Sequence, residues 1–184
     1  MSDWFKTLDG IHDRIWQTLG RGVADRKHVA RTPTFTTVRD GKPEARTIVL
    51  RAADPKTHAL DVHTDLGTAK VASLRQSPHA TFHIWDQKQR LQIRLLTTVD
   101  ILTGDAVADI WANVPDPARE VYGTRPSPGT VIPDALDYKK PADFESFAVL
   151  RCAISEIDAL HLGDEYRRAA FARSRDWQGQ WLAP

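Results

Sequence analysis

The sequence predicts a mainly β protein of the α+β class, built around a barrel. Many short segments rich in β-branched and aromatic residues are interrupted by only two or three helical patterns. The glycine-rich strand–turn–helix fingerprint of a Rossmann domain does not occur. Neither a repeat nor a linker divides the 184 residues. A chain of this length buries about 70% of its surface on folding, which supports one domain over residues 1–184.

The first helix is predicted from about residue 2 to residue 20. Ser2 is its candidate N-cap, and Gly20 or Gly22 its candidate end. Charged residues throughout this segment exclude a signal peptide and a membrane anchor, so we expect a cytoplasmic protein. The apolar residues that recur at spacings of three and four, as on one helix face, are Trp4, Phe5, Leu8, Ile11, Ile15, Trp16 and Leu19.

The next part of the chain predicts a hairpin, a single strand and a short helix. Thr34–Val38 and Arg46–Arg51 flank a turn that contains Asp, Gly and Pro, which is typical of a β-hairpin. Leu60–Thr64 alternates apolar and polar residues and predicts a third strand. Thr68–Arg75 predicts one helix with Thr68 as its N-cap.

The second half predicts two longer strands, a helix, a loop and a closing group of strands. The longer strands are Ala80–Trp85 and Leu91–Leu102, joined by a polar turn, and a helix is expected at Gly104–Asn113. Prolines and glycines indicate a long loop over residues 124–142. The remaining strands are expected at Phe144–Ile154, Ala159–Leu162 and Tyr166–Arg173, with a closing turn and strand at Trp177–Trp181.

The candidate functional residues concentrate around the third strand and the helix after it. Arg46 and Arg51 are at the two ends of an apolar segment, and their odd spacing places them on opposite faces of a strand, so they should not serve the same atom. Thr68 and Lys70 fall in the first turn of the helix, where free backbone N–H groups, a hydroxyl and a cation suit a phosphate. A neighbouring arginine can add a bidentate contact. Taken singly, each arginine is better explained as a solvated charge and Thr68 as a plain cap. Their combination indicates a phosphate site.

Other chemistries have less support in the sequence. A formal net charge of +1 lacks the basic excess of a general nucleic-acid binder. Cys152 is the only cysteine, which excludes an internal disulfide and a paired-cysteine zinc site. His79 and His83 are expected about 13 Å apart on a strand, too far to chelate one ion. We therefore expect no metal, no nucleic-acid partner and, because no stretch is apolar over bilayer length, no membrane partner.

Several short motifs, in order, resemble those of the pyridoxamine 5′-phosphate oxidase-like flavoproteins. They are Arg46-Thr-Ile-Val-Leu-Arg51, His63-Thr-Asp-Leu-Gly-Thr-Ala-Lys70, Ser77-Pro78, Trp85 and Gln92-Ile-Arg94. The resemblance runs from about Arg31 to the C-terminal residues. It implies a six-stranded split β-barrel with flanking helices, of the FMN-binding split-barrel type. It also implies a homodimer with FMN at the subunit interface, where some of the six tryptophans would pack.

The resemblance implies roles for individual residues. Arg46 and Lys70 would hold the FMN phosphate. His63 and Thr64 would lie beside the flavin, and Gln92 would contact its ring. The full set of expected cofactor contacts is Arg46, Thr47, Ile48, Val49, Leu50, Arg51, His63, Thr64, Thr68, Lys70, Gln92, Ser127 and Phe147.

Two departures from the family pattern bear on the cofactor. Ala69 stands where the family commonly has an arginine before the lysine, and Ala170 stands where a late arginine commonly reaches the cofactor. Each charge-assisted hydrogen bond lost would weaken binding by about 1.5–3 kcal/mol. We therefore expect FMN to be held less tightly than is usual in the family.

The substrate side departs further. The resemblance places Arg51 at the position of a substrate-binding lysine and Arg167 near the substrate ring, with Ala169 replacing a histidine. The positions that complete the phosphate site of the true oxidases carry Ile110, Val114 and Ala118. We therefore expect an FMN-dependent oxidoreductase that acts on a small molecule other than pyridoxamine 5′-phosphate. Two alternatives stay open: a non-catalytic carrier of flavin or haem, and a cofactor-free structural dimer.

Overall fold

One antiparallel sheet of nine strands carries the fold of residues 3–184, the part of the chain that the computed structural model describes. Its strands are β1 (Thr34–Arg39), β2 (Lys42–Thr47), β3 (Leu50–Asp54), β4 (Ala59–Asp65), β5 (His79–Asp86), β6 (Leu91–Leu102), β7 (Phe147–Leu162), β8 (Tyr166–Ala172) and β9 (Gln180–Leu182). The helices are α1 (Leu8–Ala24), α2 (Ala69–Gln76), α3 (Ala108–Ala112) and α4 (Asp116–Arg119). Short 3-10 helices lie at Trp4–Lys6, Val29–Arg31, Gly104–Val107, Phe144–Ser146 and Arg173–Arg175.

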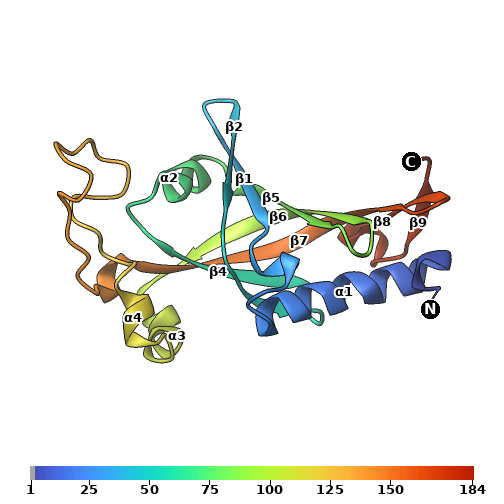
Figure 1. The fold of residues 1–184 in the computed structure, drawn as a ribbon, viewed down its shortest axis with the longest axis horizontal. Helices are drawn as coiled ribbons and strands as arrows, with labels where there is room; N and C mark the ends of the chain where they lie inside the picture. The colour runs from blue at the N-terminus through green and yellow to red at the C-terminus, as the bar shows by residue number, and fades with distance from the viewer. Residues whose placement is uncertain (1–2) are drawn as a thin grey trace.

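The two longest strands, β6 and β7, span the length of the molecule. β7 extends from the end that carries α3 and α4 to the end that carries β8, β9 and the C-terminus (Figure 1). Along the sheet the strand order is β2-β1-β5-β6-β7-β4-β3, with β8 beside β7 and β9 beside β8. The sheet is not closed, since β2 and β3 end this order without pairing with each other. The predicted mainly β, α+β split barrel with flanking helices is confirmed.

The prediction of one strand over Arg46–Arg51 is wrong. β2 ends at Thr47, and β3 begins at Leu50 at the opposite end of the sheet order. Between them, Ile48 N donates to Pro33 O at 3.2 Å, and the Ile48 side chain is only 7% exposed. Burying the Ile48 side chain stabilises the crossing of the chain from β2, which pairs with β1, to β3, which pairs with β4. The sheet has nine strands, not the six that the family resemblance implies.

Two strands predicted near the C-terminus are one strand. Phe144–Ser146 is a 3-10 turn, and β7 then runs without interruption from Phe147 to Leu162. The polar residues at positions 155, 156 and 158 suggested a break. Glu156 and Asp158 belong instead to the outward face of β7, on either side of the buried Ile157. Ser155 is an extra residue inserted between Ile154 and Glu156. A register shift opposite Leu96 and Thr97 lets the pairing with β6 continue past this point.

The helices begin and end differently from the sequence prediction. The candidate N-cap Ser2 lies outside the described residues, and α1 is capped by Thr7, whose Oγ1 accepts a hydrogen bond from Gly10 N at 3.0 Å. Gly22 does not end α1, because it lies inside the helix against Ala30, whose carbonyl carbon would be 2.6 Å from an added Cβ. The helix predicted at Gly104–Asn113 is a 3-10 turn followed by the short α3. Within residues 3–184, no helix has both the length and the apolar composition needed to span a membrane.

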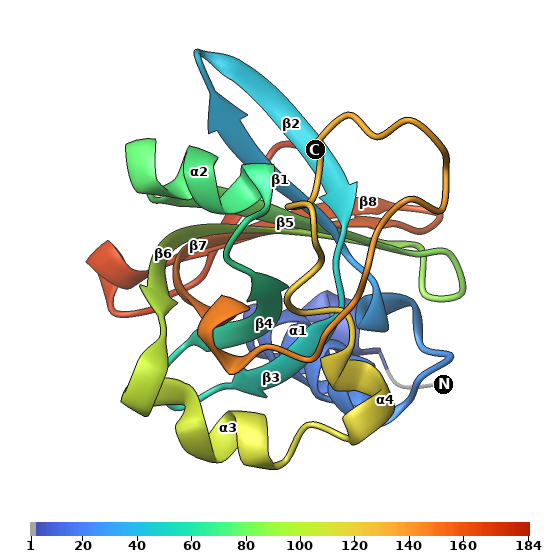
Figure 2. The same cartoon turned by 90° about the vertical axis from the view of Figure 1, so that its left-hand side faces the viewer.

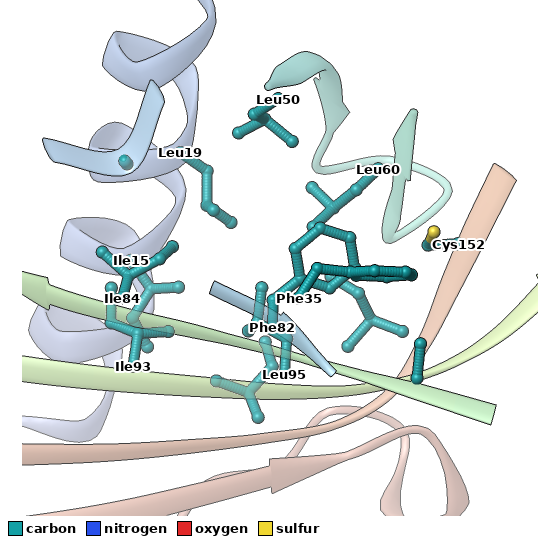
Figure 3. Packing of buried hydrophobic residues seen from close by; sticks show 14 of the residues in the cluster. Ile15, Leu19, Phe35, Leu50, Leu60, Phe82, Ile84, Ile93, Leu95 and Cys152 are labelled. Carbon is teal, nitrogen blue, oxygen red and sulfur yellow. The ribbon is translucent and has the colours of Figure 1, made fainter. Parts of the chain in front are cut away.

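Two hydrophobic cores stabilise the sheet. The main core joins α1 to the inner face of the strands, with Ile15, Leu19, Phe35 and Phe82 all fully buried (Figure 3). The lone Cys152 is buried in the same core, where burial raises the pKa of its thiol, as expected for a structural residue. A smaller core lies under α3 and α4 and contains Val107, Val114, Tyr122, Phe147 and Val149. The two cores leave β4 between them, with α2 on one side and α3 on the other (Figure 2).

Candidate functional site

Lys70, in the first turn of α2, has hydroxyl partners but no carboxylate partner among the described residues. Its Nζ donates to Thr64 Oγ1 at 2.8 Å and to Thr68 Oγ1 at 3.1 Å. Thr68 takes the predicted N-cap position, but its hydroxyl donates to Asp65 O at 2.8 Å and does not cap the helix. Val71 N donates to Thr68 O at 3.0 Å, which leaves the N–H groups of Ala69 and Lys70 available to a ligand, as at anion-binding helix N-termini.

Arg46, on β2, adds a second cation to the Lys70 group. Its Nη1 donates to Thr37 Oγ1 at 2.7 Å, and its Nη2 lies 3.3 Å from Glu44 Oε2. Burial lowers the pKa of Lys70, and the Arg46 charge lowers it further, so the two cations lie close enough to repel each other. We call Arg46, Thr64, Thr68 and Lys70 the phosphate seat. Two like charges held together beside free backbone amides form a site for an anion.

A buried carboxylate fixes the turn that leads into α2. Asp65, 6% exposed, accepts from Gly67 N and from Gly123 N, both at 2.6 Å. Gly123 has φ +107°, and an added Cβ would lie 2.6 Å from Pro141 O, so this close approach requires glycine. The loop beyond it returns to the phosphate seat, where Ser127 would lie 3.4 Å from a Cβ on Gly67. The structure thus places Ser127 beside the turn that leads into α2.

Removing the Asp65 carboxylate should destabilise the protein strongly. Asp65→Ala leaves two backbone amides without their charged acceptor, which costs about 3 kcal/mol, or roughly 6–12 °C in Tm for a chain of this size. Asp164→Ala, at a fully exposed side chain, is the matched control and should change Tm by about 1 °C or less. Thermal unfolding followed by circular dichroism measures both. Equal Tm values for the two variants would contradict the role given to Asp65.

Arg51 and His63 form a second group on the other face of β4. Neighbouring residues of a strand point to opposite faces, so His63 lies away from Thr64 and its partner Lys70. The His63 ring packs edge-on against Phe147 at 5.1 Å between centroids. Burial lowers the pKa of His63 to about 4, with the Arg51 charge contributing. Arg46 and Arg51 belong to different strands, β2 and β3, so the expectation based on their odd spacing along one strand does not apply to them.

The neutral state of His63 makes stability depend on pH. In the unfolded chain its pKa is 6.5, and in the folded chain it is about 4. Below pH 6.5 the unfolded chain therefore binds more protons, so the free energy of unfolding falls as the pH drops toward 4. Urea midpoints should decrease from pH 7 to pH 5, and the decrease should be smaller in His63→Gln. If the urea midpoints of the wild-type protein and of His63→Gln depend on pH in the same way, His63 does not contribute to the pH dependence of stability.

The other residues expected to contact the cofactor differ in what their side chains can reach. Ile48 and Leu50 are in the main core, 7% and 0% exposed, so only their backbone can face a ligand. Phe147 is fully buried in the smaller core. Thr47 is exposed and Val49 is half-buried. The apolar segment after Arg46 is thus mainly structural.

Gln92 lies near the start of β6 and belongs to a different part of the sheet from Thr64. Thr64 pairs with Ala148 of β7, whereas Gln92 pairs with Leu160. These β7 partners are twelve residues apart. That separation follows the curled β7 and is not the direct distance.

Through the other strands, Arg46 pairs with Phe35, Phe35 with Phe82, and Phe82 with Leu95, which is three residues from Gln92. Gln92 and Arg46 therefore lie about 17 Å apart but on opposite faces of the sheet, so one chain does not aim Gln92 at its own phosphate seat.

The outward face around Gln92 carries a group of charged residues that sequence reasoning missed. Asp158 Oδ2 accepts from Arg94 and from Arg168, each at 2.7 Å. Arg168 is two residues from Ala170, so both lie on the same face of β8. An arginine is thus available beside the position where Ala170 replaces the family's late arginine. We call Gln92, Arg94, Asp158 and Arg168 the ring face.

Comparison with known proteins gives one family and several related structures. The family model described as "Pyridoxamine 5'-phosphate oxidase, FMN-binding domain" matches residues 13–103. A pyridoxamine 5′-phosphate oxidase-related FMN-binding protein from Nostoc punctiforme superposes with a TM-score of 0.75 at 24% identity, over 94% of this chain and 96% of the other. The chain belongs to the pyridoxamine 5′-phosphate oxidase-like, FMN-binding split-barrel family.

Other solved structures share the fold at lower identity. PhzG from Burkholderia lata superposes with a TM-score of 0.74 at 15% identity, over 100% of this chain and 97% of the other. A protein related to general stress protein 26 from Clostridium acetobutylicum gives a TM-score of 0.60 at 13% identity, over 89% and 97% of the two chains. No curated protein matches the sequence significantly.

Proposed function

We propose that this member of the pyridoxamine 5′-phosphate oxidase-like family is a homodimeric, FMN-dependent oxidoreductase. The observation that carries the proposal is the phosphate seat, in which Arg46 and Lys70 converge on the N-terminus of α2. Lys70 has no carboxylate partner among residues 3–184, and the nearby Asp65 accepts from two backbone amides. The FMN phosphate carries the negative charge that this arrangement lacks.

Two subunits are needed to complete the proposed site. Within one chain Gln92 and Arg46 point to opposite faces of the sheet, so Gln92 would serve the flavin held by the partner subunit. The ring face lies near exposed apolar side chains, with Trp85 41% and Leu96 39% exposed. Burying these side chains against a second copy would stabilise the dimer. Arg168 would then contribute the charge that Ala170 cannot.

The bound flavin would supply the redox chemistry, and the protein would position it and its substrate. Arg46 and Lys70 would bind the phosphate, while Thr64 would hold Lys70 in place. Gln92 of the partner would hydrogen-bond the polar edge of the ring. The buried Tyr122 and Phe147 keep water out of the region under α3.

The proposed substrate is a small molecule other than pyridoxamine 5′-phosphate. Val114 is buried in the smaller core, and Ile110 and Ala118 pack against it, so apolar contacts occupy the place of a phosphate site. Turnover of pyridoxamine 5′-phosphate by FMN-loaded protein at a rate near that of a true oxidase would contradict this part of the proposal.

A non-catalytic flavin carrier is the second candidate function, and Ala69 is the observation that favours it. With alanine at position 69, the phosphate seat has two cations, Arg46 and Lys70. The family commonly has a further arginine at the position of Ala69. Freshly purified protein should be yellow and release FMN on denaturation under either function. Reduction of the bound flavin by NAD(P)H, or its rapid reoxidation by oxygen, would support the oxidoreductase. A flavin that binds but does not exchange electrons would support the carrier.

A further inference from the structure

A cavity of about 1220 Å³ lies beside α1, in a part of the molecule that the proposed flavin site does not use. Its walls are the 3-10 helix Trp4–Lys6, α1 and the loop after it, the β5–β6 turn and the β7–β8 turn. α1 runs along the sheet toward the end of the molecule that carries β8 and β9 (Figure 1). Pockets for small molecules usually measure about 300–1,000 Å³, so this cavity has room for a ligand as large as a nucleotide.

The cavity and the ring face lie on opposite faces of β7 and β8. Leu160 pairs with Arg168 of the ring face, and the next residue of β7, His161, pairs with Arg167. Neighbouring residues of a strand point to opposite faces. His161 and Arg167, which line the cavity, therefore point away from Arg168. A ligand in the cavity would not touch the ring face.

Positive charge is concentrated in this cavity. Seven cationic and four acidic side chains line it, although the whole chain has a formal net charge of only +1. Two of the acidic residues, Asp164 and Glu165, form ion pairs with arginines, and Asp25 and Asp86 accept hydrogen bonds from amide groups. The lining cations that have no ion-pair partner within residues 3–184 are Arg14, Arg21, Lys27 and Lys88.

Arg14 is held in place in the wall of the cavity. Its guanidinium lies over the Trp4 ring, 5.3 Å from the centroid, and its Nε is buried without a hydrogen-bond partner in the described part of the chain. His161, 7% exposed, has a buried Nδ1 that likewise lacks a partner there. Phe5 stacks on the His161 ring at 4.5 Å between centroids. Buried nitrogens without partners are rare, and a guanidinium that is already positioned loses little freedom when an anion binds.

The unpaired cations extend along the cavity. Arg14 and Arg21 are seven residues apart on α1, which places them on the same side of the helix, about 10 Å apart along its axis. Lys88 approaches from another wall, in the turn between β5 and β6. One carboxylate or one phosphate cannot contact cations spread over this length, whereas a chain of linked phosphates can.

We propose that this cavity binds a polyphosphate chain. Arg14 donates its two parallel N–H groups to one phosphate, and Arg21 and Lys88 neutralise the charge of the others. This group is common to nucleoside triphosphates and to free inorganic polyphosphate. The site goes beyond the proposed oxidoreductase, because it shares no residue with the phosphate seat or the ring face.

Tripolyphosphate is the probe that tests this site, by isothermal titration calorimetry on the full-length protein with FMN in excess. At about 0.15 M salt, exposed charges are largely screened. One tripolyphosphate should bind per chain, and orthophosphate should bind at least about tenfold more weakly. ATP that binds as tightly as tripolyphosphate supports a nucleotide ligand, and tripolyphosphate binding without ATP binding supports free polyphosphate. If neither triphosphate binds saturably, or if orthophosphate binds equally well, the proposal is overturned.

Variants of the two arginines of α1 show whether the cavity is where the probe binds. Arg14→Gln should weaken tripolyphosphate binding by about tenfold or more. Arg21→Ala should weaken it by about threefold to tenfold; Arg21 is exposed, so this variant keeps the fold even if Arg14→Gln loosens α1. Arg75→Ala, an exposed residue of α2 outside the cavity, is the control and should bind the probe as the wild-type protein does. Unchanged affinity in both Arg14→Gln and Arg21→Ala would contradict the assignment.

FMN content, measured on the same samples, reports separately on the proposed function. Arg14→Gln and Arg21→Ala should retain as much FMN as the wild-type protein. If the protein binds no FMN but binds tripolyphosphate in a way that depends on Arg14, the flavin proposal fails and the polyphosphate site stands.

Discussion

Lys70→Ala should lower the affinity for FMN by about tenfold to 150-fold, since it removes one charge-assisted hydrogen bond worth about 1.5–3 kcal/mol. Arg46→Ala should do the same, and the double variant should lose most of its bound flavin at micromolar protein. The loss is expected because, among residues 3–184, the Lys70 ammonium donates only to the hydroxyls of Thr64 and Thr68. No carboxylate there competes with the FMN phosphate for its charge. Flavin fluorescence titration of the apoprotein gives the dissociation constants.

The matched control for Lys70 lies on the same helix. Arg75 is an exposed residue in the last turn of α2, so Arg75→Ala removes a charge without touching the phosphate seat. It should bind FMN within about twofold of the wild-type protein, because surface charges contribute little. If Arg75→Ala and Lys70→Ala weaken FMN binding equally, the effect comes from the overall charge of the protein. The start of α2 then holds no specific phosphate site.

Arg168→Ala should also weaken FMN by about tenfold or more, although Arg168 is remote from the phosphate seat of its own chain. The proposed reason is that the ring face of one subunit completes the site of the other. Gln92→Leu should have a smaller effect of about twofold to tenfold, since it removes a neutral hydrogen bond. Both dissociation constants come from the same fluorescence titration.

Lys88→Ala is the control for this second group. Lys88 is exposed in the turn between β5 and β6, at the same end of the molecule as Gln92. Its removal should leave FMN affinity unchanged. If the Arg168→Ala variant and the Gln92→Leu variant both bind FMN with normal affinity, the ring face contributes nothing to the cofactor site.

The sequence predicted the local features of the phosphate seat because they depend on residues close in the chain. The Thr68 turn, the start of α2 and the position of Lys70 follow from N-cap and turn chemistry. The proximity of Arg46 was predicted from the strand that precedes the site and from the family resemblance. The extra role of Asp65 was not predicted, because its bond to Gly123 joins residues 58 positions apart.

The predictions failed where long-range packing decides the structure. Arg46–Arg51 looks like one apolar strand, yet the burial of Ile48 divides it between two edges of the sheet. Arg168 was overlooked because its contact with Asp158 depends on the pairing of β7 with β8. These contacts become visible only when strands distant in sequence are placed together.

A hybrid dimer tests most directly whether two chains build each FMN site. One subunit would carry Arg46→Ala with Lys70→Ala, and the other, distinguished by an affinity tag, Gln92→Leu with Arg168→Ala. Each homodimer should bind FMN poorly. The purified hybrid has one undamaged site out of two if the sites are shared, so it should bind one FMN per dimer with wild-type affinity. A hybrid with no tight site, or one that matches the average of the two homodimers, would contradict the shared site.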